Sequence, residues 1–191
     1  AGHCATQAMP FSHSVRGMTL GIAGLGRIGR EIARRAEVFG MQVKYYNRSK
    51  RRDVPYDYVP GLRALAEQAD VLLLSTPGGE ATRHMVNADI LTALGPRGTL
   101  INIGRGSLVD ENALIKALRT GTIAAAGLDV FADLAHPPAA LFELDNVVLS
   151  PHRGSATFEA RSAMARLFVA NVDACFNDQP LLTPVIPDAR D

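Results

Sequence analysis

Short apolar runs alternate with longer polar or amphipathic stretches from Met18 to about residue 150. The runs read MTLGIA, MQVKYY, DVLLLS, GTLINI, IAAAGL and NVVLS. Strands that are buried on both faces read as continuous apolar runs, which favours a parallel sheet. We therefore expect a parallel sheet with helices between its strands, in a doubly wound α/β fold.

Two helices are predicted inside this alternation. The first follows the MTLGIA run, and Gly40 would end it. Asp110 can cap the second, over residues 111–120, and Gly121 would close it. The apolar stripe predicted for the first helix consists of Ile28, Ile32, Ala33, Ala36 and Phe39.

The pattern changes after His152. The stretch SATFEARSAMARLFVANVDACFND predicts one long amphipathic C-terminal helix. Its expected apolar face holds Ala163, Leu167, Ala170 and Ala174. We therefore divide the chain into a lead-in segment over residues 1–16, an α/β domain over residues 17–154, and a helix with an extended tail over residues 155–191.

Composition narrows the class of protein. The 191 residues are 47% hydrophobic and 20% charged, as in a soluble globular protein. A net charge of +1 gives no reason to expect binding to nucleic acid or an anionic membrane. No apolar run approaches the roughly 20 residues of a membrane span. Cys4 and Cys175 form no CxxC, so we expect no metal site and no disulfide, with reduced thiols in a cytoplasm.

The motif GLGRIG follows the first expected strand and opens the first expected helix. In that context a G-x-G-x-x-G predicts a Rossmann-type dinucleotide-binding domain. Gly24 permits the tight turn, Gly26 lets the backbone approach a pyrophosphate, and Gly29 lets helix and strand pack closely. The N–H groups of Arg27 and Ile28 would face the phosphates. The alternative is a glycine-rich turn without a ligand.

The residues after the second expected strand indicate which dinucleotide the chain binds. An acid about 20 residues beyond the fingerprint would bind the ribose 2′-hydroxyl of NAD. Asn47 stands at that place, and Asp53 comes several residues too late. Arg48, Ser49 and Lys50 offer a charged fork, a hydroxyl and an ammonium, which suit a 2′-phosphate. We therefore expect NADP, with NAD as the alternative cofactor. The other alternative is that these cations form a solvated basic loop that binds no cofactor.

Three polar residues follow later strands, at the edge where open α/β sheets bind ligands. Arg105 lies between two glycines, and its guanidinium suits an α-keto carboxylate. Asp129 and His152 follow two further strands, and a histidine there could act as a general acid. The structural alternatives are a surface cation, a loop cap and a packed histidine.

Several motifs together resemble those of the D-isomer-specific 2-hydroxyacid dehydrogenases: GLGRIG, TRHMVNADIL, INIGRGSLVDENAL, AGLDVF, NVVLSPHRGSAT and PLLTPV. The resemblance covers residues 17–186 and is to the nucleotide-binding domain of that family. The NRSK stretch is most similar to the NADPH-dependent glyoxylate/hydroxypyruvate and hydroxyphenylpyruvate reductases. The resemblance implies an oxidoreductase that transfers hydride between NADP(H) and a small 2-oxo or 2-hydroxy acid, and we expect a cytoplasmic homodimer.

The resemblance also implies roles for individual residues. Arg105 would hold the substrate carboxylate and carbonyl, and His152 would protonate the carbonyl oxygen, both beside the cofactor. Asp129 would contact the nicotinamide carboxamide. The other implied cofactor-binding residues are Thr76 and Pro77 beside the adenosine, Ile103 and Gly104 near the nicotinamide ribose, and Gly154.

Two features depart from the family pattern. The long N-terminal segment that forms most of the substrate domain is absent from these residues, so we expect the chain alone to turn over poorly. Leu134 takes the place of the family's catalytic glutamate, and Asp133 and Glu143 are the alternatives for that role. A nucleotide-binding module without turnover, for sensing or association, is therefore the second hypothesis. A structural partner subunit is the third.

Overall fold

The computed structural model describes residues 13–185 of the chain. The chain divides into two compact units, Ala1–Pro151 and His152–Asp191. The predicted lead-in segment, residues 1–16, lies mostly outside the described residues, and so does Cys4.

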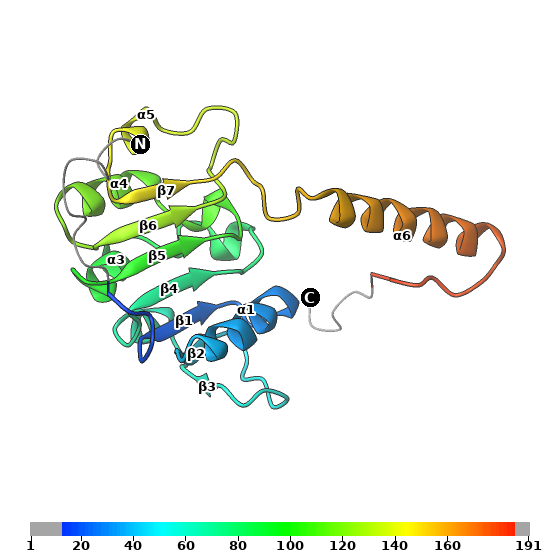
Figure 1. Ribbon diagram of the computed structural model, residues 1–191, viewed down its shortest axis with the longest axis horizontal. Helices are drawn as coiled ribbons and strands as arrows, with labels where there is room; N and C mark the ends of the chain where they lie inside the picture. The colour runs from blue at the N-terminus through cyan, green and yellow to red at the C-terminus, as the bar shows by residue number, and fades with distance from the viewer. Residues whose placement is uncertain (1–12, 186–191) are drawn as a thin grey trace, which may run out of the picture. The chain divides into compact units, whose positions relative to one another are not determined.

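The first unit is a fully parallel seven-stranded sheet with helices on both faces (Figure 1). Its strands are β1 (Thr19–Ala23), β2 (Gln42–Tyr46), β3 (Asp57–Tyr58), β4 (Val71–Leu74), β5 (Thr99–Asn102), β6 (Ala125–Leu128) and β7 (Val147–Leu149). The strand order is β3-β2-β1-β4-β5-β6-β7, so the chain reverses its direction of travel across the sheet after β3 and continues from β4 on the other side of β1. The predicted doubly wound, Rossmann-type fold is confirmed.

Each of the six apolar runs contains one strand of the sheet. The sequence did not predict β3, because its two residues belong to no apolar run. This strand forms by pairing with β2, with Lys44 opposite Asp57 and Tyr45 opposite Tyr58. Its position at the edge of the sheet explains why it needs no continuous apolar sequence.

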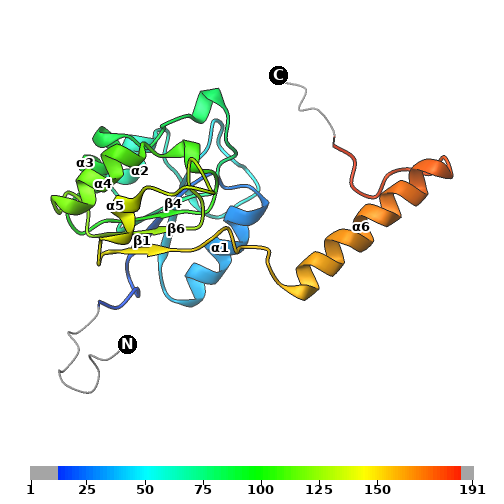
Figure 2. The same cartoon turned by 90° about the horizontal axis from the view of Figure 1, so that it is seen from above.

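Helix α1 covers one face of the sheet, and α2, α3 and α4 cover the other (Figures 1 and 2). The helices of this unit are α1 (Arg27–Val38), α2 (Leu62–Ala66), α3 (Ala88–Leu94), α4 (Glu111–Arg119) and α5 (Ala139–Phe142), with short 3₁₀ turns at Glu80–Thr82 and Gly106–Leu108. Asp110 caps α4 as predicted, since its Oδ1 accepts the N–H of Ala113 at 3.1 Å. Two apolar clusters, one under each helix layer, form the core.

The buried face of α1 differs from the predicted stripe. Gly29, Ala33 and Ala36 are buried, whereas Ile28 and Phe39 are exposed. A Cβ on Gly29 would lie 3.3 Å from Cγ2 of Ile22, so the helix packs closely on β1 at this point. Small residues therefore form the contact, and the prediction that Ile28 and Phe39 share the buried face is wrong.

The end of α1 is as predicted. Gly40 has φ +75°, in the left-handed region that glycine adopts without strain. Its N–H donates to the carbonyl of Glu37 at 2.9 Å, and the N–H of Met41 donates to that of Ala36 at 3.1 Å. This pair of bonds satisfies the last carbonyls of the helix and turns the chain into β2.

The second unit contains the predicted long C-terminal helix, α6 (Phe158–Phe176). The Oγ1 of Thr157 accepts the N–H of Ala160 at 3.1 Å and caps its start. Of the predicted apolar face, Ala174 is buried, whereas Leu167 is exposed within this unit. Phe168, which lies outside the predicted face, is exposed as well, and Ala174 is the buried residue of this helix. Among residues 13–185, no helix combines the length and apolarity that a bilayer crossing requires.

Candidate functional site

The predicted site residues of the first unit lie at the carboxyl edge of the sheet. Parallel strands place their carboxyl ends on one edge, which is where open α/β sheets bind ligands. These residues follow β1 (Gly24 to Gly29), β2 (Asn47 to Ser49), β4 (Thr76, Pro77), β5 (Ile103 to Arg105) and β6 (Asp129). The sheet therefore gathers segments that are far apart in the sequence.

The glycines of the turn after β1 meet different surroundings. Gly24 has φ +100°, and a Cβ there would lie 2.7 Å from Oγ1 of Thr76. A Cβ on Gly29 would lie 2.5 Å from the carbonyl oxygen of Gly24. A Cβ on Gly26 would meet nothing within 4 Å. Two of these glycines are thus required for packing, whereas Gly26 borders open space.

Helix α1 begins directly after this turn. Arg27 and Ile28 are its first two residues, so their N–H groups have no carbonyl of a preceding helical turn to bind. Both residues are exposed. The start of a helix attracts anions because its free N–H groups and its dipole both favour negative charge.

The chain after β2 is attached to the same turn. The Oδ1 of Asn47 accepts the N–H of Leu25 at 2.7 Å. One residue earlier in the turn, the N–H of Gly24 donates to the carbonyl of Tyr46 at 2.9 Å. Asn47 therefore lies against the glycine turn, at the place where the sequence analysis expected an acid in an NAD site.

A run of cations follows Asn47. Arg48, Ser49 and Lys50 are all exposed. The first acid after them, Asp53, pairs with Arg30 on α1 at 2.7 Å. The hydrogen bond from Arg30 lowers the pKa of the Asp53 carboxyl. This acid is thus held on α1, and the segment after Asn47 presents positive charge and a hydroxyl.

The turn after β4 packs against the glycine turn. The Oγ1 of Thr76 donates to the carbonyl of Ala23 at 3.0 Å. The Oγ of Ser75 donates to the carbonyl of Gly24 at 2.7 Å. Sequence reasoning did not identify Ser75, because nothing local to DVLLLS indicates that its partner lies 51 residues earlier.

Asn102 organises the turn that carries Arg105. Asn102 is 1% exposed, and among residues 13–185 it is the one buried residue with an amide or charged side chain. Its Oδ1 accepts the N–H of Gly104 at 3.1 Å, and its Nδ2 donates to the carbonyl of Arg105 at 3.0 Å. Its own carbonyl accepts the N–H of Asp129 at 3.0 Å. Asn102 was not among the predicted site residues, although a polar side chain inside the apolar run GTLINI is a signal in the sequence.

Glycines let the neighbouring loops approach Arg105. A Cβ on Gly78 would lie 3.0 Å from Cγ of Arg105. A Cβ on Gly106 would overlap the backbone of Phe131. The guanidinium of Arg105 is exposed, and its Nη1 donates to the carbonyl of Gly104 at 2.7 Å. The loops after β4, β5 and β6 thus surround an exposed cation.

The loop after β6 contains Leu134, at the position where a catalytic glutamate was expected. Leu134 is 52% exposed. The Oδ2 of Asp133 lies 3.1 Å from Nδ1 of His136, and this hydrogen bond lowers the pKa of Asp133. Glu143 pairs with Arg119 at 3.2 Å. Both carboxylates that could replace the glutamate therefore already have surface partners, His136 and Arg119.

His152 and Gly154 lie at the start of the second unit. His152 has φ +53°, a left-handed conformation that is uncommon outside glycine. The structure thus brings together the site residues that follow β1, β2, β4, β5 and β6, while these two belong to a unit of their own.

The family follows from comparison with known proteins. A family model described as the NAD-binding domain of D-isomer specific 2-hydroxyacid dehydrogenases matches residues 1–154. The chain belongs to this family. The resemblance expected from the sequence motifs is therefore confirmed.

Two curated members of the family are close in sequence. A glyoxylate/hydroxypyruvate reductase of Arabidopsis thaliana is 51% identical over 170 residues, which cover 89% of this chain and 54% of the relative. A 2-ketogluconate reductase of Gluconobacter oxydans is 45% identical over 186 residues, covering 97% and 60%. The chain spans little more than half the length of these relatives.

A solved structure of the family has the same fold. It is the NADPH-dependent glyoxylate/hydroxypyruvate reductase of Sinorhizobium meliloti in complex with NADP and malonate. Its sequence is 49% identical and the TM-score is 0.90, with 95% of this chain and 57% of that chain covered. The chain therefore has the architecture of the NAD-binding domain of this family.

Proposed function

We propose that this chain is the nucleotide-binding part of an oxidoreductase that transfers hydride between NADP(H) and a small 2-oxo or 2-hydroxy acid. The substrate class is that of glyoxylate and hydroxypyruvate. When bound, the cofactor would supply or accept the hydride. The residues of the chain would bind and orient the cofactor and the substrate, and would donate or accept the proton.

The observation that carries the cofactor assignment is the bond from the Leu25 N–H to Asn47. It places an amide, not a carboxylate, beside the glycine turn. A carboxylate there would repel a 2′-phosphate, whereas Arg48 next to it can donate two charged hydrogen bonds to one. Asp53 is held by Arg30 and leaves this positive charge in place.

Arg105 supports the assignment of a carboxylate substrate. Its exposed guanidinium lies on a turn whose backbone is held by a hydrogen bond from the buried Asn102 side chain. Two N–H groups of the guanidinium can therefore bind a planar carboxylate. We assign His152 the role of general acid, which protonates the carbonyl oxygen as hydride adds to the carbon. The reductases of Arabidopsis thaliana and Sinorhizobium meliloti support the substrate class through their similarity.

Calorimetric titration with NADPH and with NADH tests the cofactor. A single charged hydrogen bond contributes roughly 1.5–3 kcal/mol, which corresponds to about tenfold or more in affinity. We therefore expect NADPH to bind at least about tenfold more tightly. Equal affinities, or tighter binding of NADH, would contradict the proposal.

A nucleotide-binding module without turnover is the second candidate. The exposed Leu134 favours it, because leucine can neither orient a histidine nor keep it protonated. The hydrogen bond between Asp133 and His136 also favours a module without turnover, because this carboxylate already has a partner. Tight NADPH binding without oxidation of NADPH in the presence of glyoxylate or hydroxypyruvate would select this function.

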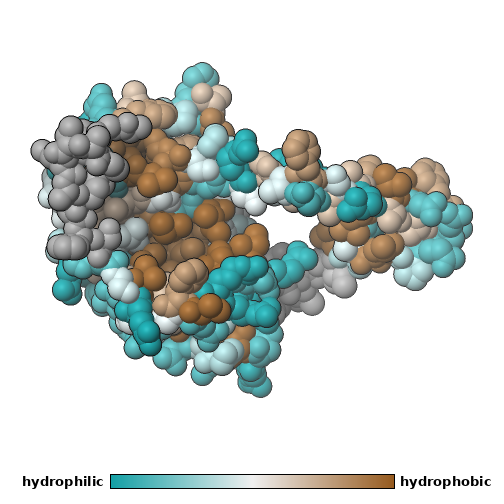
Figure 3. Space-filling model, in the orientation of Figure 1, coloured by the Kyte–Doolittle hydropathy of each residue, from teal (hydrophilic) through white to brown (hydrophobic). Residues whose placement is uncertain are grey.

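We also propose a cytoplasmic homodimer. Figure 3 shows apolar residues on the visible face of the first unit. Phe142 and Val148 of this unit are exposed. A second copy would remove such surface from water. Cys175 is a free, exposed thiol, which suits a reducing compartment. Light scattering in solution tests the dimer, and cell fractionation tests the location.

A further inference from the structure

The basic loop, residues 48–53, is attached to the sheet at its start and near its end. At the start, the carbonyl of Asn47 accepts the hydroxyl of Tyr58 at 3.3 Å, and its side chain binds the Leu25 N–H. At the far end, Arg30 on α1 holds Asp53. The three residues proposed to meet a 2′-phosphate lie between these attachments.

Tyr45 supplies a further attachment. Its side chain is 0% exposed, on β2. The hydroxyl oxygen accepts the N–H of Arg51 at 2.8 Å and donates to the carbonyl of the same residue at 3.2 Å. One phenol group therefore binds both backbone polar groups of Arg51, directly after the exposed segment.

The hydroxyl is not needed for the packing of Tyr45. The ring lies in the smaller apolar cluster, and its centroid is 5.4 Å from that of Tyr58. A phenylalanine would fill the same space with the same ring. A buried hydroxyl is costly unless it is hydrogen-bonded, and the Tyr45 hydroxyl makes both of its hydrogen bonds to the backbone of Arg51 in the basic loop. The hydroxyl therefore acts on the loop.

We propose that Tyr45 is a specificity-determining positioning residue, which holds the basic loop in the shape that presents Arg48, Ser49 and Lys50 to a 2′-phosphate. The inference rests on the proposed NADP function. A loop that is already ordered loses less conformational freedom when it binds, so its affinity for the phosphate rises. NADH has no 2′-phosphate and gains nothing from this order.

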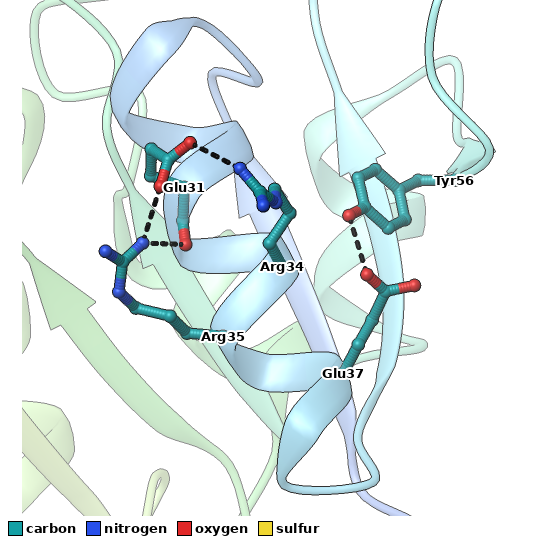
Figure 4. Close-up of polar contacts among 5 residues, drawn as sticks. All are labelled: Glu31, Arg34, Arg35, Glu37 and Tyr56. Atoms are coloured by element: carbon teal, nitrogen blue, oxygen red, sulfur yellow. Dashed lines mark hydrogen bonds and ion pairs between the residues drawn. The ribbon is translucent and has the colours of Figure 1, made fainter.

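The variant Tyr45→Phe tests the proposal by removing the hydroxyl alone. We expect its affinity for NADPH to fall by about two- to tenfold, as for the loss of order of one or two side chains, and its affinity for NADH to stay unchanged. Tyr56→Phe is the matched control. The Tyr56 hydroxyl donates to Oε2 of Glu37 at 2.9 Å (Figure 4), so that variant also loses one tyrosine hydrogen bond, but outside the basic loop. Both affinities should remain at wild-type values in the control.

The outcomes separate this proposal from the function on which it rests. If wild-type protein does not discriminate between NADPH and NADH, the NADP function fails. If wild type discriminates and Tyr45→Phe discriminates equally well, or loses both affinities alike, the role of Tyr45 is refuted. Should Tyr45→Phe not fold, hydrogen exchange of the Arg51 amide in the wild-type protein without cofactor decides, because this N–H donates to the Tyr45 hydroxyl. Slow exchange supports a loop that is already ordered, and exchange as fast as in an unstructured chain overturns it.

Discussion

The side chain of Asn102 donates a hydrogen bond of 3.0 Å to the backbone carbonyl of Arg105, the residue that we assign to the substrate carboxylate. The same amide accepts the N–H of Gly104 at 3.1 Å. The buried side chain of Asn102 thus fixes the backbone of the exposed Arg105. The exposed cation is free to meet a ligand because the turn beneath it is held from inside the protein.

Removal of this amide should destabilise the first unit. Asn102→Ala leaves a buried N–H and a carbonyl without their partner, at a cost of about 1–3 kcal/mol for each group. Urea unfolding measures the loss. Asn146→Ala is the control, because its amide likewise makes two hydrogen bonds to the backbone, both to carbonyls (Leu118 and Ala124), but is only partly buried. A smaller loss is expected there, and equal losses would contradict the special role of Asn102.

The glycines of the turn after β1 should separate binding from folding. Gly26→Ala places a methyl group in open space, so we expect unchanged stability and weaker binding of NADPH. Gly29→Ala drives a methyl group toward the carbonyl of Gly24 and should cost about 1–3 kcal/mol of stability. Thermal unfolding and calorimetry are the measurements. Gly61→Ala is the control, because its methyl group also has no atom within 4 Å, and it should change neither stability nor NADPH affinity. If Gly26→Ala binds NADPH as tightly as wild type, Gly26 does not belong to the cofactor site.

Arg48→Ala should act on NADPH alone. Loss of a charged hydrogen bond of roughly 1.5–3 kcal/mol weakens binding about tenfold or more, while binding of NADH stays nearly unchanged. Arg63→Ala removes the same charge from α2, where the arginine pairs with Glu67. That control should leave both affinities unchanged. Equal effects of the two variants would mean that net charge, and not a contact at Arg48, attracts the cofactor.

The carboxyl of Asp53 should titrate below its ordinary pKa. Arg30 stays protonated throughout the acidic range, so its hydrogen bond favours the ionised carboxylate. Because the folded-state pKa is lowered, the stabilisation is present above the ordinary pKa and is lost as pH falls through the lowered value. NMR titration of the carboxyl carbon checks this. Arg30→Gln should move the pKa upward toward its ordinary value, and an unmoved pKa would show that the pair does not persist in solution.

In a full-length context, Leu134→Glu should raise the rate of NADPH-dependent reduction of glyoxylate. The family resemblance implies that a glutamate at position 134 orients His152, to which we assign the role of general acid, and keeps it protonated, so the upper limb of the pH–rate profile should move to higher pH. General acid catalysis contributes on the order of 10²–10⁴-fold, and we expect part of that factor to be gained. Asp133→Asn is the control. If it abolishes activity while Leu134→Glu adds nothing, Asp133 has taken over the role despite its pairing with His136.

The sequence by itself determined the architecture and the position of the glycine turn. Six strands could be predicted because burial on both faces of a parallel sheet requires continuous apolar runs. The turn from Gly24 to Gly29 could be predicted because its requirements are local, namely positive φ and the absence of a side chain. Asn47 and Arg48 were identified by their distance along the chain from that turn.

The tertiary structure decided which side chains support these positions. The strand β3 exists because β2 offers it an edge, and its own residues do not indicate it. Ser75 binds Gly24 across 51 residues, and Arg30 binds Asp53 across 23, because parallel strands bring their carboxyl ends to one edge. Ile28 and Phe39 share a helical spacing with the buried residues of α1 but are exposed, since the axis and rotation of the helix on the sheet set its buried face. Contacts of this kind depend on strand order and helix orientation, which no local pattern of residues contains.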